Sequence, residues 1–285
     1  MWIGTEINPA VYSATATTGN TNQRRLLYLQ NPSEGQYFAS VTQVDMNGEG
    51  HYNGGLFSVQ KRFSNSYSLS GSYTLSRCIN DQDPQQFLSS VYSQPGNPKA
   101  DRGPCAGDRL HVVNATAVVN TPRFESAALR AVASGWQWST IYQASSGAPM
   151  NVTIGRDNAL TGAPNQRPNV VGDWKLTDPT AAMWFNTAAF TLPAPGTYGN
   201  LARNALRGPG TWNIDTGITR RFAAGAGRQV EVRAEAFNVF NLVRAGVAGT
   251  GVAGVPNTTF TNSLFGKVTT AADPRILQFA IKYVF

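Results

Sequence analysis

The sequence has little charge, no long apolar run and only two cysteines. Asp, Glu, Lys and Arg make up 14% of its 285 residues, against roughly 25% in ordinary soluble domains. No stretch approaches the roughly 18 consecutive apolar residues that a transmembrane helix needs, which argues against a helical membrane protein. The polarity comes from Ser, Thr, Asn, Gln and Gly instead. Small polar residues mixed with apolar ones indicate a sheet with two different faces, such as a barrel wall between lipid and water.

The chain also lacks any concentration of basic residues, although its formal net charge is +7. The lysines and arginines are scattered, and the adjacent ones are pairs such as Arg24–Arg25 and Arg220–Arg221. Proteins that bind nucleic acid gather such residues on one face or along one helix. We therefore expect no nucleic-acid partner.

The two cysteines, Cys78 and Cys105, lie in a region rich in Asp, Pro and Gly. Neither belongs to a C-x-x-C pair, so a zinc site is not expected. A disulfide between them would close a loop of roughly 28 residues and contribute about 3 kcal/mol in the loop-entropy model. It would require an oxidising compartment such as the periplasm or the cell surface. Two unpaired thiols are the alternative.

The first residues, Met1 to Glu6, carry no basic segment and no apolar core. They therefore do not form a secretory signal peptide. For a membrane barrel, this predicts either a fragment of a longer protein or an incorrectly assigned gene start.

In the last eleven residues, all the odd positions from Leu277 on are large and apolar. Gln278, Ala280 and Lys282 occupy the even positions. Because side chains on a strand point alternately to opposite faces, this pattern predicts a strand with one apolar face. Its length suits the roughly 9–11 residues that cross a bilayer at a tilt, and its terminal aromatics suit an interfacial girdle. The apolar residues expected to face lipid include Phe279, Ile281, Tyr283 and Phe285.

The same alternation recurs upstream and predicts about seven strands, or eight with a short one near 36–44. The connections between them are alternately short and long, as in membrane barrels. The fold class is therefore expected to be all-β: an antiparallel meander forming part of a transmembrane outer-membrane β-barrel, with long extracellular loops and short periplasmic turns. The predicted strands lie near 50–63, 66–79, 109–122, 133–146, 211–222, 228–241 and 274–285.

On this prediction residues 1–49 form an extracellular loop region, and residues 50–285 contain the barrel strands. Single-chain bacterial barrels have an even strand count, so an odd number that starts from an outside loop predicts a partial barrel. Within the long 147–210 loop, Asp178-Pro179 offers a helix cap and a proline at the first helical position. We therefore expect a short helix over Thr180–Asn186.

Several segments resemble the C-terminal barrel region of TonB-dependent receptors, especially the Oar-like group that contains a carboxypeptidase-regulatory-like domain. The resemblance covers nearly the whole chain and is most specific over its last 80 or so residues. The segments that carry it are Ile7–Tyr12, Asn22–Arg25, Tyr52–Leu56, Ser70–Thr74, Asp108–His111, Arg167–Asn169, Trp184–Asn186, Arg207–Gly210, Arg233–Asn238, Phe265–Lys267 and Asp273–Phe285.

This resemblance implies a larger parent with a plug domain, a TonB box and a barrel of roughly 22 strands. The chain would be about the last third of that barrel, and the parent would take up an unknown ligand with energy coupled through TonB. Phe279, Ile281, Tyr283 and Phe285 would form the signal that the outer-membrane assembly machinery reads. Cys78 and Cys105 would form a loop disulfide. Expected partners are thus outer-membrane lipid, that machinery, the ligand, and TonB through the parent's N-terminal part.

Two other classes of protein fit the pattern less well. A small self-contained barrel, either a passive pore or an autotransporter translocator, would need an even strand count. A secreted β-sandwich used for adhesion would be soluble without detergent, against which the exposed aromatic stripe of the last strand argues.

No motif predicts an enzyme, a cofactor or a metal site. Gly249–Gly254 matches G-x-G-x-x-G, but Pro256 and polar residues follow instead of a helix, so a surface loop is expected. His51 or His111 with Asp108 lacks a nucleophile elbow. Four aspartates share one loop without the spacing of a compact calcium motif, and we expect a solvated acidic loop there. They are Asp81, Asp83, Asp101 and Asp108.

Overall fold

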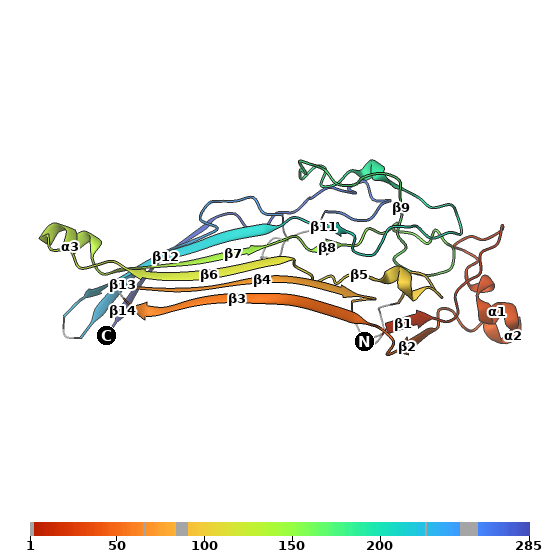
Figure 1. Ribbon diagram of the computed structural model, residues 1–285, viewed down its shortest axis with the longest axis horizontal. Helices are drawn as coiled ribbons and strands as arrows, with labels where there is room; N and C mark the ends of the chain where they lie inside the picture. The colour runs from red at the N-terminus through yellow and green to blue at the C-terminus, as the bar shows by residue number, and fades with distance from the viewer. Residues whose placement is uncertain (1–2, 65, 84–90, 226, 246–255) are drawn as a thin grey trace.

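Seven long strands form one antiparallel meander in the computed structural model, which describes residues 3–64, 66–83, 91–225, 227–245 and 256–285 (Figure 1). The spatial order is β14-β13-β12-β7-β6-β4-β3, and the short β5 (Gly103–Pro104) pairs with the end of β4. The expected all-β antiparallel fold is therefore confirmed. The strands are β3 (Gly50–Ser64), β4 (Tyr67–Asn80), β6 (His111–Asn120), β7 (Trp136–Ser145), β12 (Thr211–Ala223), β13 (Gln229–Phe237) and β14 (Ile276–Val284).

The register places most of the large apolar residues of the seven strands on one side of this sheet. Val119, for example, pairs with Tyr67 on one neighbour and with Trp138 on the other. Because a one-residue slip would move a whole strand's apolar set to the other side, the alternation fixes this register. We call this side the apolar face. It includes Phe57, Val59, Tyr67, Leu69, Tyr73, Leu75, Val113, Ala115, Ala117, Val119, Trp136, Trp138, Tyr142, Trp212, Ile214, Ile218, Val230, Val232, Ala234, Ala236, Leu277, Phe279, Ile281 and Tyr283.

The opposite side of the sheet, the polar face, carries mainly hydroxyl, amide and charged groups. On this face Glu231 of β13 accepts hydrogen bonds from Arg221 at 2.8 Å and from Arg233 at 3.0 Å. A face with so many polar groups has to be in contact with water. Its polar members include Ser58, Gln60, Ser68, Ser70, Ser72, Thr74, Asn114, Thr116, Gln137, Ser139, Gln143, Asn213, Asp215, Thr219, Arg221, Glu231, Arg233, Glu235, Gln278 and Lys282.

The two edge strands, β3 and β14, are not paired with each other in the described part of the chain. All residues of β14 are exposed, and so are all residues of β3 except the half-buried Lys61. Neighbouring strands of the meander run in opposite directions, and β3 and β14 are the first and the seventh of them. The two edge strands therefore run in the same direction, from the long loops toward the short turns. A direct seam between them would be parallel.

The long connections gather at one end of the sheet, which we call the loop end, and the short turns at the other, the turn end (Figure 1). The helices of the described residues are all too short to cross a membrane. At the loop end lie β1 (Ile3–Glu6), η1 (Asn22–Arg24), α1 (Leu26–Gln30), α2 (Pro32–Gly35), β2 (Thr42–Asp45), η2 (Pro98–Asp101), β8 (Pro149–Met150), β9 (Asn169–Val170), η3 (Thr187–Ala189), β10 (Phe190–Thr191) and β11 (Leu206–Arg207).

Three local predictions need correction. The helix expected over Thr180–Asn186 is absent, because its backbone bonds to another loop: Trp184 N–H donates to Gly266 O at 2.8 Å, and Val268 N–H to Ala181 O at 2.7 Å. Asn186 instead caps η3, accepting from Ala188 N–H at 3.1 Å. The extra strand expected near 36–44 is β2, which starts only at Thr42 and pairs with β1. The link between β6 and β7 contains a helix, α3 (Ala127–Ala133).

The buried apolar residues of the described chain all lie outside the seven long strands. The largest cluster of them, which we call the loop core, is formed by the 147–210 region and receives Phe260 and Phe265 from a later loop. The wall itself has no buried apolar interior. The buried members of the loop core are Met150, Val152, Phe185, Ala189, Phe190, Leu201 and Leu206.

Candidate functional site

The loop end is a folded platform held by an aromatic cluster. The ring of Phe185 meets that of Phe190 edge-on, with centroids 5.7 Å apart, and that of Phe265 at 5.1 Å. Phe260 also contacts Phe265 edge-on, at 5.4 Å. Such geometries add stabilisation beyond the burial of the rings. The 147–210 and 256–270 loops are therefore joined into one surface that the protein can present to a ligand.

Each of the four loop aspartates is paired with an arginine. Asp81 contacts Arg102 at 2.7 Å and Asp83 contacts Arg203 at 2.6 Å, while Asp101 pairs with Arg167 and Asp108 with Arg207. Asp101 and Asp108 are only 2% and 3% exposed, so the expectation of a solvated acidic loop is wrong. Burying a carboxylate is unfavourable unless a cation and hydrogen bonds compensate it, and these arginines supply both.

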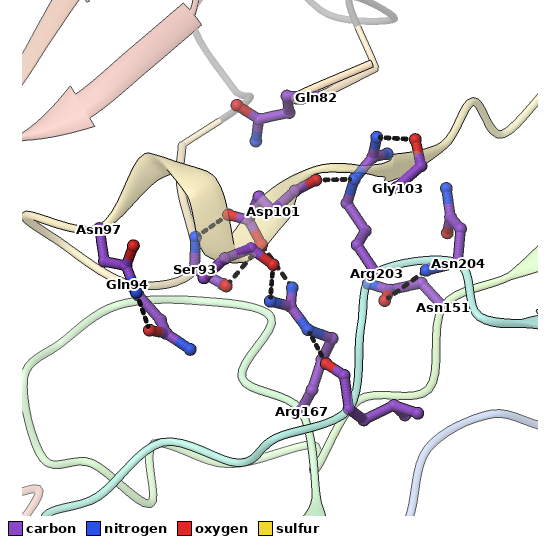
Figure 2. A network of polar contacts seen from close by, with 12 residues as sticks. Gln82, Ser93, Gln94, Asn97, Asp101, Gly103, Asn151, Arg167, Arg203 and Asn204 are labelled. Carbon is purple, nitrogen blue, oxygen red and sulfur yellow. Dashed lines mark hydrogen bonds and ion pairs between the residues drawn. The ribbon is translucent and has the colours of Figure 1, made fainter. Parts of the chain in front are cut away.

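Two of these arginines join loops that are distant in sequence (Figure 2). Arg167 donates to Leu201 O and to Ala100 O, both at 2.8 Å, in addition to its bond with Asp101. Asp101 also accepts from Ser93 N–H at 2.6 Å. The planar guanidinium donates in several fixed directions at once, which suits it to satisfy buried carbonyls.

Arg203 completes the same network at the end of β4. It donates to Asn80 O at 2.9 Å and to Gly103 O at 3.3 Å, besides its ion pair with Asp83. Both Arg167 and Arg203 are buried. Sequence reasoning missed these roles, because nothing local to an arginine in a polar loop indicates which carbonyls it will contact.

Cys78 and Cys105 form a disulfide in the structure, with their Cα atoms 5.4 Å apart. Cys105 N–H donates to Cys78 O at 3.1 Å, and Cys78 N–H donates to the carboxylate of Asp108 at 2.7 Å. The disulfide therefore joins the end of β4 to the segment that enters β6, directly beside the Asp108–Arg207 ion pair.

A hollow of about 520 Å³ opens between the paired strands β1 and β2 and the 92–102 segment. Its lining includes three carboxylates, those of Asp45, Glu49 and Asp81, and two cationic side chains, those of Lys99 and Arg102. Tyr92 also lines it; burial, followed by the nearby Asp81, raises the pKa of its phenol. A neutral phenol and carboxylates in one concavity can exchange hydrogen bonds with a polar small molecule.

The residues considered for catalysis are not brought together. The Asp108 carboxylate is occupied by Cys78 N–H and Arg207, whereas His111 Nδ1 lies 2.8 Å from the Tyr73 hydroxyl. His51 lies 4.0 Å from Glu49 in an exposed pair. Within the described ranges no group of three or more His, Cys, Asp or Glu side chains is arranged to hold a metal ion. The Gly249–Gly254 segment lies outside the described residues.

Aromatic and basic side chains gather on the apolar face at the turn end. The Lys61 ammonium lies 3.7 Å from the centre of the Tyr67 ring, and the Arg220 guanidinium lies 4.6 Å from that of Phe222. Arg220 also lies over Trp136, at 5.6 Å. Long basic side chains with their stems on aromatic rings are typical of the boundary between lipid and water.

The four C-terminal residues singled out from the sequence all lie at the exposed β14 edge or just beyond it. Phe279 and Ile281 are 76% and 79% exposed, and the terminal Phe285 contacts Tyr283 with ring centroids 6.3 Å apart. Phe279, Ile281 and Tyr283 extend the apolar face to its last strand. These side chains are thus available to lipid or to another protein.

The family model of the outer membrane beta barrel domain matches residues 1–278. Searches of curated proteins and of solved structures find no match to the chain. A wall with one apolar and one polar face, aromatic residues at its rim, and long loops at one end is the arrangement that such barrels use. The chain therefore belongs to the outer membrane beta barrel domain family, and its place is the bacterial outer membrane.

Proposed function

We propose that the chain is part of a TonB-dependent receptor and supplies a section of its barrel wall with the extracellular loops above it. On this proposal the loop end faces the outside and the turn end faces the periplasm, as in other outer-membrane barrels. The parent would bind a ligand at the loop end and take it up with energy coupled through TonB.

The observation that carries the proposal is the folded loop end. It combines an aromatic core, buried ion pairs, a disulfide and a hollow of about 520 Å³. A passive pore requires little more than a wall and a lumen, whereas a receptor requires a rigid surface that can select a ligand. The resemblance over Arg233–Asn238 and Asp273–Phe285 points to the same family of receptors.

The open sheet supports a role as one section of a larger wall. Unpaired strand edges are not tolerated in lipid, since their backbone groups find no partners there. Because β3 and β14 run in the same direction, an antiparallel closure needs an odd number of further strands between them. A self-contained barrel, the competing function, would have to accept a parallel seam instead.

Residues 1–49 belong to the extracellular part on this proposal. They pack against the 147–210 loop, where Arg24 donates to Leu160 O at 2.8 Å and Ala10 N–H donates to Thr161 O at 2.9 Å. Binding rather than catalysis is the proposed activity, because Asp108 and His111 contact other groups. Phe279, Ile281, Tyr283 and Phe285 are proposed as the segment that the barrel-assembly machinery recognises.

The test is the composition of the protein isolated from the outer membrane of cells that carry its gene. A polypeptide much larger than 30.6 kDa, which cross-links to TonB in energised cells, is the expected result. A polypeptide of 30.6 kDa that opens stable channels in a planar bilayer would contradict the proposal and favour the self-contained barrel.

A further inference from the structure

The link between β6 and β7 contains a short apolar helix that projects from the turn end (Figure 1). Its sequence, Ala127–Ala133, has Arg130 as its one charged residue. Leu129 and Val132 are three residues apart and so lie on the same side of the helix, while Ala131 lies on the opposite side. The side chain of Arg130 turns back to donate to Phe124 O at 3.1 Å.

Two side chains of the apolar face hold the C-terminal end of α3. Trp136 Nε1 donates to Val132 O at 2.7 Å, and Arg220 donates to the same oxygen at 3.0 Å. The two residues are cross-strand partners. Cations and N–H donors at a helix C-terminus satisfy carbonyls that have no partner within the helix. The helix is therefore attached on the lipid side of the wall and not on its polar side.

The exposed side chains of α3 extend the aromatic and basic rim of the apolar face. Leu129 is 52% exposed and Val132 is 73% exposed, although both are large and apolar. The Val132 carbonyl contacts both Trp136 and Arg220, which form part of the lipid–water boundary described above. An apolar helix with cations beside it suits the interfacial layer of a phospholipid leaflet, where apolar groups enter the acyl region and cations meet phosphates.

We propose that α3 is an interfacial anchor, whose Leu129 and Val132 insert into the phospholipid leaflet at the turn end. Arg130 and Arg220 lie at the level of the phosphates, and Ala131 faces water. The helix thereby fixes the depth of the β6–β7 hairpin in the bilayer. This inference depends on the outer-membrane location of the chain and is independent of what the receptor transports.

The test uses single-cysteine variants Leu129→Cys, Val132→Cys and Ala131→Cys, each labelled with a nitroxide. The native cysteines are joined as a disulfide, so only the introduced thiol reacts. Ala224→Cys, in the tight turn between β12 and β13 at the same end, is the matched control in water. The whole protein is extracted with its surrounding lipid in polymer nanodiscs, and collision rates with oxygen and with a water-soluble nickel chelate are measured.

We expect labels at 129 and 132 to collide preferentially with oxygen, and labels at 131 and 224 to collide preferentially with the nickel chelate, with a several-fold difference in the ratio of the two rates. Nickel accessibility at 129 and 132 equal to that at 224 would overturn the proposal, because the helix would then lie in water. Protection of 129 and 132 from both reagents would also overturn it, since a protein would then cover them.

Discussion

The wall and the loop end of this protein are built on opposite rules. In the wall, apolar side chains point away from the protein, and residues such as Phe57 and Ile281 are mostly exposed. At the loop end, Phe185 and Val152 are buried as in an ordinary soluble domain. The difference follows from the solvent: lipid covers the apolar face of the wall, whereas water around the loops drives apolar groups inward. The chain therefore has its protein core above the membrane and not within the sheet.

The largest expected difference is in the stability lost when a large apolar side chain is truncated to alanine in each of the two regions. Phe185→Ala should destabilise the loop end by about 3–5 kcal/mol, because it leaves a cavity between Phe190 and Phe265. Leu75→Ala on the apolar face should cost much less, since lipid can fill the space. Urea unfolding of the whole protein, monitored through the protease resistance of each region, measures both losses. Equal losses for the two variants would mean that the two regions share one kind of core.

Ion pairs sharpen the same comparison. Asp101→Ala should cost about 3–5 kcal/mol, because it leaves Arg167 buried without its partner. Glu231→Gln on the polar face should cost much less, since both of its partners, Arg221 and Arg233, are well exposed there. The same unfolding assay compares them. A larger loss for Glu231→Gln than for Asp101→Ala would contradict the burial argument.

Reduction of the Cys78–Cys105 disulfide should act on the loop end alone. The bond closes a loop with a sequence separation of 27 residues, and its loss should cost about 3 kcal/mol in the loop-entropy model. After reduction, proteases should cleave the 81–108 region faster while β12 to β14 stay protected. The double variant Cys78→Ser with Cys105→Ser is the control that separates loss of the bond from side effects of the reductant.

The smallest expected effect is a dependence on alkaline pH. The pKa of Tyr92 is raised in the folded protein by burial and by Asp81. The neutral phenol is thus favoured by folding, so its contribution is complete below the unfolded pKa and is lost as pH rises through the folded value. Tyr92→Phe should remove this part of the loss, as measured by loop-end unfolding at increasing pH. An identical alkaline profile in the variant would show that Tyr92 does not contribute.

The sequence predicts the wall much better than the loop end for a physical reason. Alternation along β6 or β14 is local, so the position and facing of Val113 or Phe279 can be inferred from their neighbours alone. The loop core depends on contacts between distant segments, such as Phe185 with Phe265 and Arg203 with Asn80. The helix expected over Thr180–Asn186 failed for this reason, because its backbone bonds to the 266–268 segment instead.

The most direct test of the two-faced wall is an accessibility scan along β6 in the outer membrane. Single cysteines at positions 113 to 118 are labelled with a nitroxide, and their collisions with oxygen in lipid and with a nickel chelate in water are compared. We expect a period of two: lipid contact at Val113, Ala115 and Ala117, and water contact at Asn114, Thr116 and Val118. Equal exposure of both sets to water, or a period near 3.6, would contradict it.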